Sequence, residues 1–279
     1  MFFLKKIIDF YIFSNIHVAL AGFFLTKITL FKFGISNSLT PLFVALSIVV
    51  SYNFIRFFEI KTNRLHWFKS WFVNYKNQLL LLSIVSTLLL NYLVFFTEFN
   101  LQSIYILLPF AFMTFFYVVP FFKTKKIEFS FRNFPSIKII SIAISWAGIT
   151  VFFPLYEAEF EFNATVYLEF VQRFLFLIAI TIPFDIRDVY VDEKFLKTLP
   201  QVIGVNHSKM IGYILLLLMI LSEFYIHKNT DYNSFILLVI GIIAAAFLGF
   251  SSPRRTRFYT GFWIEGIPIL WYGLIVLFS

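Results

Sequence analysis

Long apolar runs separated by short polar segments make up almost the whole chain. An apolar run of about 18–25 residues is long enough to cross a bilayer as a helix. Runs of about this length lie at 11–31, 39–58, 78–96, 101–121, 137–155, 164–184, 208–227, 233–250 and 259–278. The pattern therefore predicts nine transmembrane helices.

The segments between these runs are too short to hold a soluble domain. Nine spans of about 20 residues take up about 180 positions, and the rest is divided among eight loops and two ends. Lys5 and Lys6 precede the first run as in a signal peptide, but the run continues to Phe31 and eight more follow. We therefore expect a retained first span and one all-α integral membrane domain over residues 1–279.

Composition agrees with a lipid environment. The chain is 60% hydrophobic and 14% charged, whereas a soluble domain is about 45–50% apolar and about 25% charged. These values exclude an ordinary soluble domain and a disordered chain. With no Cys and 10 Gly, disulfide scaffolds, thiolate metal sites and collagen are excluded as well.

The net charge of +8 follows a regular order along the chain. Most of the 23 Lys and Arg residues lie at the N-terminus or after the second, fourth, sixth and eighth runs. Basic residues concentrate in cytoplasmic loops, which predicts a cytoplasmic N-terminus and an external C-terminus. The charge thus reflects orientation and lipid contact rather than a nucleic-acid partner. We expect the protein in a bacterial cytoplasmic (inner) membrane.

Several ionisable residues fall inside or at the ends of the apolar runs, where charge is costly and usually faces a partner or a cavity. They are His17, Arg56, Glu59, Asp185 and Glu265. For His17 the alternative is a neutral ring that is hydrogen-bonded between helices. Glu169 and Arg173 stand four residues apart and are expected to pair along one helix.

Three aspartates follow the sixth run. Asp185, Asp188 and Asp192 have the spacing i, i+3 and i+7, which places them on one face of a helix. Their mutual repulsion is relieved by a cation, and Mg²⁺ commonly binds one or two carboxylates together with substrate phosphates. The alternative is a solvated acidic helix end that Arg187, Lys194 and Lys197 neutralise. Spacing alone leaves both interpretations open.

This segment resembles a motif of a known family. Asp185-x-x-Asp188-x-x-x-Asp192, followed by Lys197-Thr198-Leu199-Pro200 and Gly204, is similar to the second aspartate-rich motif of the UbiA-type intramembrane prenyltransferases. That family has nine helices around a central cavity, and its motif binds the Mg²⁺ that holds a polyprenyl diphosphate. The resemblance implies that the three aspartates are catalytic metal ligands. Arg187 and Lys197 are expected to bind substrate beside them.

A second, shorter likeness follows the fourth run. Tyr117-x-x-Pro120-x-x-Lys123 is similar to a Tyr…Lys element of the same family, in which the lysine contacts the diphosphate. The resemblance implies that Tyr117 and Lys123 are substrate-binding residues.

The family's first motif is degenerate in this chain. Asn53 matches that motif, but the aspartate positions that follow hold Phe54, Phe57 and Lys61. One hypothesis is that Arg56, Lys61 and Arg64 neutralise the diphosphate directly, since guanidinium groups match phosphate oxygens. The other is that the fold has been kept and catalysis lost, because fold does not fix activity.

The expected function follows from the resemblance. It is Mg²⁺-dependent transfer of a polyprenyl group from its diphosphate to an unidentified small-molecule or lipid acceptor, at a site that faces the cytoplasm. The alternative is an inactive relative that binds an isoprenoid lipid or serves as an assembly subunit.

Overall fold

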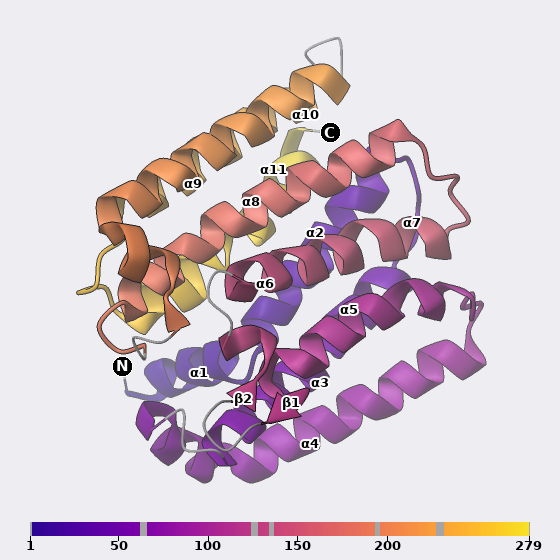
Figure 1. Cartoon of the computed structure of the whole chain (residues 1–279). Coiled ribbons are helices and arrows are strands. Elements are labelled where there is room, and N and C mark those ends of the chain that lie inside the picture. Colours follow the sequence, from indigo (N-terminus) through magenta and orange to yellow (C-terminus); the bar gives the residue numbers. More distant parts are fainter. Residues whose placement is uncertain are drawn as a thin grey trace.

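A bundle of helices forms the protein (Figure 1). The computed structural model describes residues 2–61, 66–123, 128–133, 137–192, 196–226 and 232–278. The α-helices are α1 (Phe2–Phe13), α2 (Ile16–Lys32), α3 (Leu39–Lys61), α4 (His66–Phe96), α5 (Ser103–Val118), α6 (Ile137–Ala147), α7 (Phe153–Glu157), α8 (Ala164–Asp188), α9 (Leu199–Ile226), α10 (Tyr232–Phe250) and α11 (Ile267–Phe278).

Short elements complete the fold. They are the antiparallel strands β1 (Phe122–Lys123) and β2 (Glu128–Phe129), the 3₁₀ turn η1 (Phe131–Asn133) and two π-helical segments, η2 (Gly148–Phe152) and η4 (Tyr259–Ile264). Helix α6 continues through η2 into α7, and η4 leads into α11. Each of these two series is long enough to form a single span.

Every apolar run predicted from the sequence contains helix, but the number of spans differs from nine. Seven helices in the described part of the chain are long and apolar enough to cross a membrane. An eighth span requires that the bent pair α1 and α2 count as one. The run at 101–121 contains α5, which has only 16 residues. The all-α membrane architecture is confirmed, whereas the nine-span count is not.

The bend between α1 and α2 has a local cause. Asn15 adopts a left-handed backbone conformation (φ 69°), which Asn tolerates better than most residues. Its side-chain amide donates to the Asn53 side-chain oxygen at 2.7 Å, and the Arg56 guanidinium donates to the carbonyl of Phe13 at the end of α1. Helix α3 therefore holds both sides of the 57° bend.

Apolar side chains cover both the inside and the outside of the bundle. The main core cluster lies among α2, α8, α9, α10 and α11 and includes the fully buried Phe176 and Trp271. Large apolar side chains are also exposed along α4 and α9, for example Leu81, Leu88 and Leu217. Exposed apolar rows on helices are typical of surfaces that face lipid.

A buried network of charges joins α2, α8 and α9. The predicted pair is confirmed, since Arg173 Nη2 lies 3.1 Å from Glu169 Oε1. The Lys32 ammonium contacts Glu169 at 2.9 Å and Glu223 at 3.5 Å. Arg173 also donates to the carbonyl of Leu25 at 2.9 Å. The side chains of all four charged residues are almost completely buried, so each charge depends on the others.

Replacing Glu169 with Gln tests this network. The variant keeps the shape of the side chain but leaves Lys32 and Arg173 with too little negative charge. Removing one partner of a buried ion pair costs about 3 kcal/mol or more, so we expect a clearly lower melting temperature in detergent. Glu161→Gln, at an exposed position, is the matched control. Equal melting temperatures for the two variants would show that the network contributes little to stability.

Candidate functional site

A cavity of about 370 Å³ lies inside the bundle. Residues of α2, α3, α5, α6 and α8 form most of its wall, and α1, α4, η1, η4, the start of α11 and the segments next to them contribute the rest. Most of its lining is apolar or aromatic, but charged side chains are also present. Small-molecule sites are usually apolar cavities with a small number of polar groups, and this cavity has more charged residues than that usual form.

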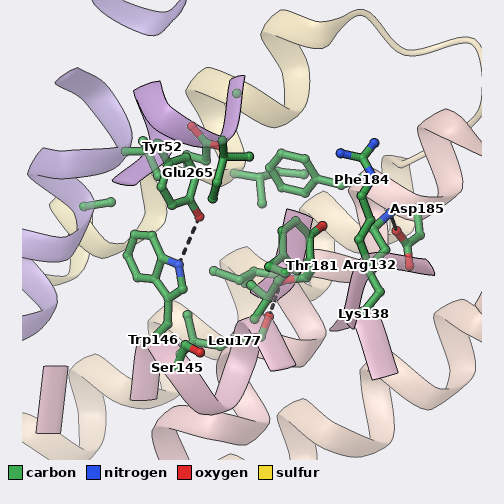
Figure 2. Close-up of a pocket in the computed structure, with 18 of the residues that line it drawn as sticks. Tyr52, Arg132, Lys138, Ser145, Trp146, Leu177, Thr181, Phe184, Asp185 and Glu265 are labelled. Carbon is green, nitrogen blue, oxygen red and sulfur yellow. Dashed lines mark hydrogen bonds and ion pairs between the residues drawn. The ribbon is translucent and has the colours of Figure 1, made fainter. Parts of the chain in front are cut away.

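The polar residues of the cavity fall into two groups. Figure 2 shows Arg132, Lys138 and Asp185 at one side, with Tyr52, Trp146 and Glu265 at the other. The apolar part of the wall includes Leu177, which the view places between the groups. The cavity therefore offers one charged end, an apolar middle and a second, smaller polar end.

Lys138 brings two of the predicted aspartates together. Its ammonium lies 2.8 Å from Asp185 Oδ1 and 3.3 Å from Asp192 Oδ2. Asp185 belongs to the last turns of α8, whereas Asp192 lies beyond the helix end at Asp188. The single helical face expected from the spacing thus extends only to Asp188. The backbone N–H of Asp192 donates to the carbonyl of Asp188 at 2.8 Å, which keeps Asp192 close to the helix end.

Asp188 has a different cationic partner. Arg187 Nε lies 2.8 Å from one oxygen of Asp188, and Arg187 Nη2 lies 2.5 Å from the other. Arg187 also donates to the hydroxyl of Thr260 in η4. Both Arg187 and Asp188 line the cavity. The forked pair lies within α8, and the hydrogen bond from Arg187 to Thr260 connects it to η4.

The other predicted site residues are divided between the cavity and positions away from it. Arg56 and Tyr117 line the cavity. Asn53 does not: its side chain accepts from Asn15 and donates to the Ser83 hydroxyl at 3.1 Å. Lys61 and Lys197 are exposed and are not part of the cavity wall.

Some predictions fall outside the described residues. Arg64 and Lys194 are not among them, and for Lys123 the structure describes the backbone in β1 but not the side chain. The predicted diphosphate contacts of Arg64 and Lys123, and the predicted neutralisation of the aspartates by Lys194, therefore stay predictions.

Sequence reasoning missed several residues of the cavity. Lys138, at the start of the fifth apolar run, and Arg132, after the fourth run, have no sequence signal beyond their contribution to the basic orientation pattern. Arg132 forms an ion pair with Glu59, one of the predicted membrane-depth acids. Tyr52 and Trp146 had no signal in the sequence beyond their residue types. Glu265 was noted for its depth, and it does line the cavity.

The charges of the cavity wall are balanced. Its five basic residues are Arg56, Arg132, Lys138, Arg187 and Arg257, and its five acidic residues are Glu59, Asp185, Asp188, Asp192 and Glu265. Most of them are paired with one another, so an anion that binds here must exchange partners with the carboxylates or arrive together with a cation. Within the described ranges, no group of three His, Asp or Glu side chains is arranged to hold a metal ion. Two of the carboxylates nevertheless converge on one point, which Lys138 occupies.

Comparison of the chain with protein-family models, curated proteins and solved structures finds no match.

The Lys138→Met variant tests whether Lys138 competes with a metal ion. It leaves Asp185 and Asp192 close together without their shared cation. Because a neighbouring unit charge is worth about 1 kcal/mol or more at this range, we expect Mn²⁺ to bind at least about fivefold more tightly than in the wild type, as measured by electron paramagnetic resonance. Lys27→Met, which removes a lysine that donates to the Asn37 carbonyl, should leave Mn²⁺ affinity unchanged. Equal Mn²⁺ affinity in all three proteins would mean that the aspartates do not form a cation site.

Proposed function

We propose that the chain is an intramembrane prenyltransferase of the UbiA type, which transfers a polyprenyl group from its diphosphate to an acceptor bound in the cavity. The observation that supports this most directly is the division of the cavity into a charged end and an apolar, aromatic remainder. A polyprenyl diphosphate has the same division, with an anionic head and an isoprenoid chain. The family resemblance of the aspartate segment is independent of this shape.

The diphosphate head would bind at the charged end. Lys138 and Arg187 already hold carboxylates there, and both side chains make strong hydrogen bonds to phosphate oxygens as well. Arg187 offers a planar fork that suits phosphate, while Lys138 acts as a compact point charge. During transfer these groups would stabilise the negative charge that develops on the departing diphosphate.

The donor set at this end is also compatible with Mg²⁺. Asp185 and Asp192 converge on one cation, and Mg²⁺ is typically held by one or two carboxylates plus substrate phosphates. The balanced charge of the cavity wall gives a second reason to expect a bound cation, since a diphosphate adds negative charge that the paired bases do not neutralise. Asp185 and Asp192 would hold the ion, with Asp188 close by. The bound ion would supply further neutralisation of the leaving group.

The rest of the cavity suits the prenyl chain and its reactive carbon. Leu25, Leu177 and Ile180 provide an apolar wall, which keeps water away from a carbocation-like intermediate. Aromatic faces attract cations, and Tyr52 and Trp146 lie in the wall where they would provide that attraction. The basic segments at the charged end follow the second, fourth, sixth and eighth apolar runs, so the diphosphate would enter from the cytoplasmic side of a bacterial inner membrane.

The second candidate function is isoprenoid binding without transfer, or a role as an assembly subunit. A specific observation supports it. The first-motif positions Phe54 and Phe57 are 42% and 48% exposed, and neither lines the cavity. The carboxylates that serve the family on α3 therefore have no replacement at those positions in this chain.

Diphosphate release distinguishes the two functions. Purified protein is incubated with Mg²⁺ and labelled polyprenyl diphosphates of several chain lengths, with and without candidate acceptors. For the enzyme we expect release by the wild type and a loss of about 100-fold in Asp185→Asn, since this is the usual effect of removing one group that supports a developing charge.

Asp9→Asn, in α1 and away from the cavity wall, is the matched control, and melting temperatures verify that both variants are folded. Unchanged release in Asp185→Asn would contradict the role of the aspartates. Tight binding of the diphosphate without release by the wild type would favour the binding protein.

A further inference from the structure

Opposite Arg132, Lys138 and Asp185, the wall of the cavity carries Glu265, Tyr52 and Trp146 (Figure 2). Glu265 directly follows the π-helical segment η4, and its backbone N–H donates to the carbonyl of Thr260 at 3.1 Å. This bond spans five residues, as π-helical hydrogen bonds do, and such segments are frequent at functional sites. The local backbone therefore departs from the α-helix next to a carboxylate of the cavity.

Glu265 differs from the other acidic residues of the wall in its pairing. Glu59, Asp185, Asp188 and Asp192 each form an ion pair with a basic side chain. Among the described residues, no ion pair or hydrogen bond is formed by the Glu265 carboxylate. Its charged neighbours are Arg56 and Arg187, which already donate to the Phe13 carbonyl and the Thr260 hydroxyl. A carboxylate in an apolar chamber is costly, and a ligand that donates a hydrogen bond reduces this cost.

Tyr52 supplies the complementary group. The indole N–H of Trp146 donates to the Tyr52 hydroxyl oxygen at 3.0 Å, which orients the hydroxyl and leaves its own proton available for donation. Figure 2 shows Tyr52 and Glu265 on the same side of the cavity. This end of the cavity thus combines a hydrogen-bond acceptor with a hydrogen-bond donor. A hydroxyl group matches that pair, because it donates one hydrogen bond and accepts another.

From this arrangement we propose that Glu265 and Tyr52 bind the hydroxyl group of the acceptor, and that Glu265 is the catalytic base of the transfer. The proposal rests on the proposed function and specifies its second substrate as an alcohol or a phenol. An alkyl ammonium fits less well, because it cannot accept from Tyr52 and has no free electron pair with which to attack.

The reaction is balanced with the groups present. The bond between the first prenyl carbon and the diphosphate oxygen breaks, and its electron pair leaves with the diphosphate. The acceptor oxygen forms a new bond to that carbon, and its proton moves to the Glu265 carboxylate. The products are a prenyl ether and diphosphate, and Glu265 afterwards returns the proton to solvent. No oxidant or reductant is needed.

The test separates binding of the diphosphate from transfer. Full-length protein is supplied with Mg²⁺, labelled geranylgeranyl diphosphate and a panel of primary alcohols and phenols, each matched with its methyl ether. Without an added acceptor, water is the hydroxyl compound. We expect Glu265→Gln to bind the diphosphate within about twofold of the wild type and to lose about 100-fold or more in transfer, which is the range for a general base.

Two further variants sharpen the assignment. Glu265→Asp keeps the carboxylate and should recover part of the rate. Tyr52→Phe removes one hydrogen bond and should raise the KM for the acceptor by about tenfold. The exposed Glu161→Gln serves as the control and should behave as the wild type.

Each outcome has a definite meaning. Transfer by Glu265→Gln at the wild-type rate overturns the catalytic base, as does loss of diphosphate binding in that variant. If a methyl ether binds at the acceptor site as tightly as its matched alcohol or phenol, measured as competition with the acceptor, the proposed hydroxyl site is overturned. All three results leave the proposed function intact, provided that the wild type releases diphosphate. A wild type that releases none overturns the proposed function and the base together.

Discussion

Charges inside a helix bundle that faces lipid are costly unless they are paired, and this constraint determines how the structure is held together and where it can bind a ligand. Two networks of paired charges are central to it. Lys32, Glu169, Arg173 and Glu223 form a closed network among α2, α8 and α9. Lys138, Asp185 and Asp192 form the other at the wall of a cavity. Buried pairs of the first kind fix the positions of helices, whereas pairs that face a cavity can exchange partners with an incoming anion.

Helix α8 connects the two networks. Arg173 and Asp185 are twelve residues apart, which is about 18 Å along an α-helix. The contacts of Arg173 with α2 hold this helix in position, and its last turns then present Asp185 and Asp188 to the cavity. A rigid element that carries the site at one end and a buried anchor in its middle suits the positioning of a charged substrate. Prenyl transfer requires such positioning, because diphosphate and acceptor must meet at one carbon.

The sequence predicted those features that depend on one segment at a time. The apolar runs, the Glu169–Arg173 pair and the presence of Glu59 and Glu265 at a cavity all follow from local spacing and hydropathy. The pairing of Lys138 with Asp185 does not follow from local spacing. The two residues are 47 positions apart in the sequence, on α6 and α8, and their contact depends on how each helix is rotated. The exposure of Lys61, at the end of α3, has the same cause. The bend at Asn15 depends on hydrogen bonds with residues of α3, and the shortness of α5 is not visible in hydropathy alone.

The central claim is that Lys138 and the two aspartates around it form the site for the diphosphate head. An experimental structure with Mn²⁺ and geranylgeranyl thiodiphosphate, a slowly reacting analogue, tests it most directly, because the anomalous signal locates the metal. The account predicts a Mn²⁺ peak between Asp185 and Asp192, the Lys138 ammonium within hydrogen-bond distance of the diphosphate, and the prenyl chain directed past Leu177. A diphosphate bound elsewhere, with Lys138 still bridging the two aspartates, would contradict it.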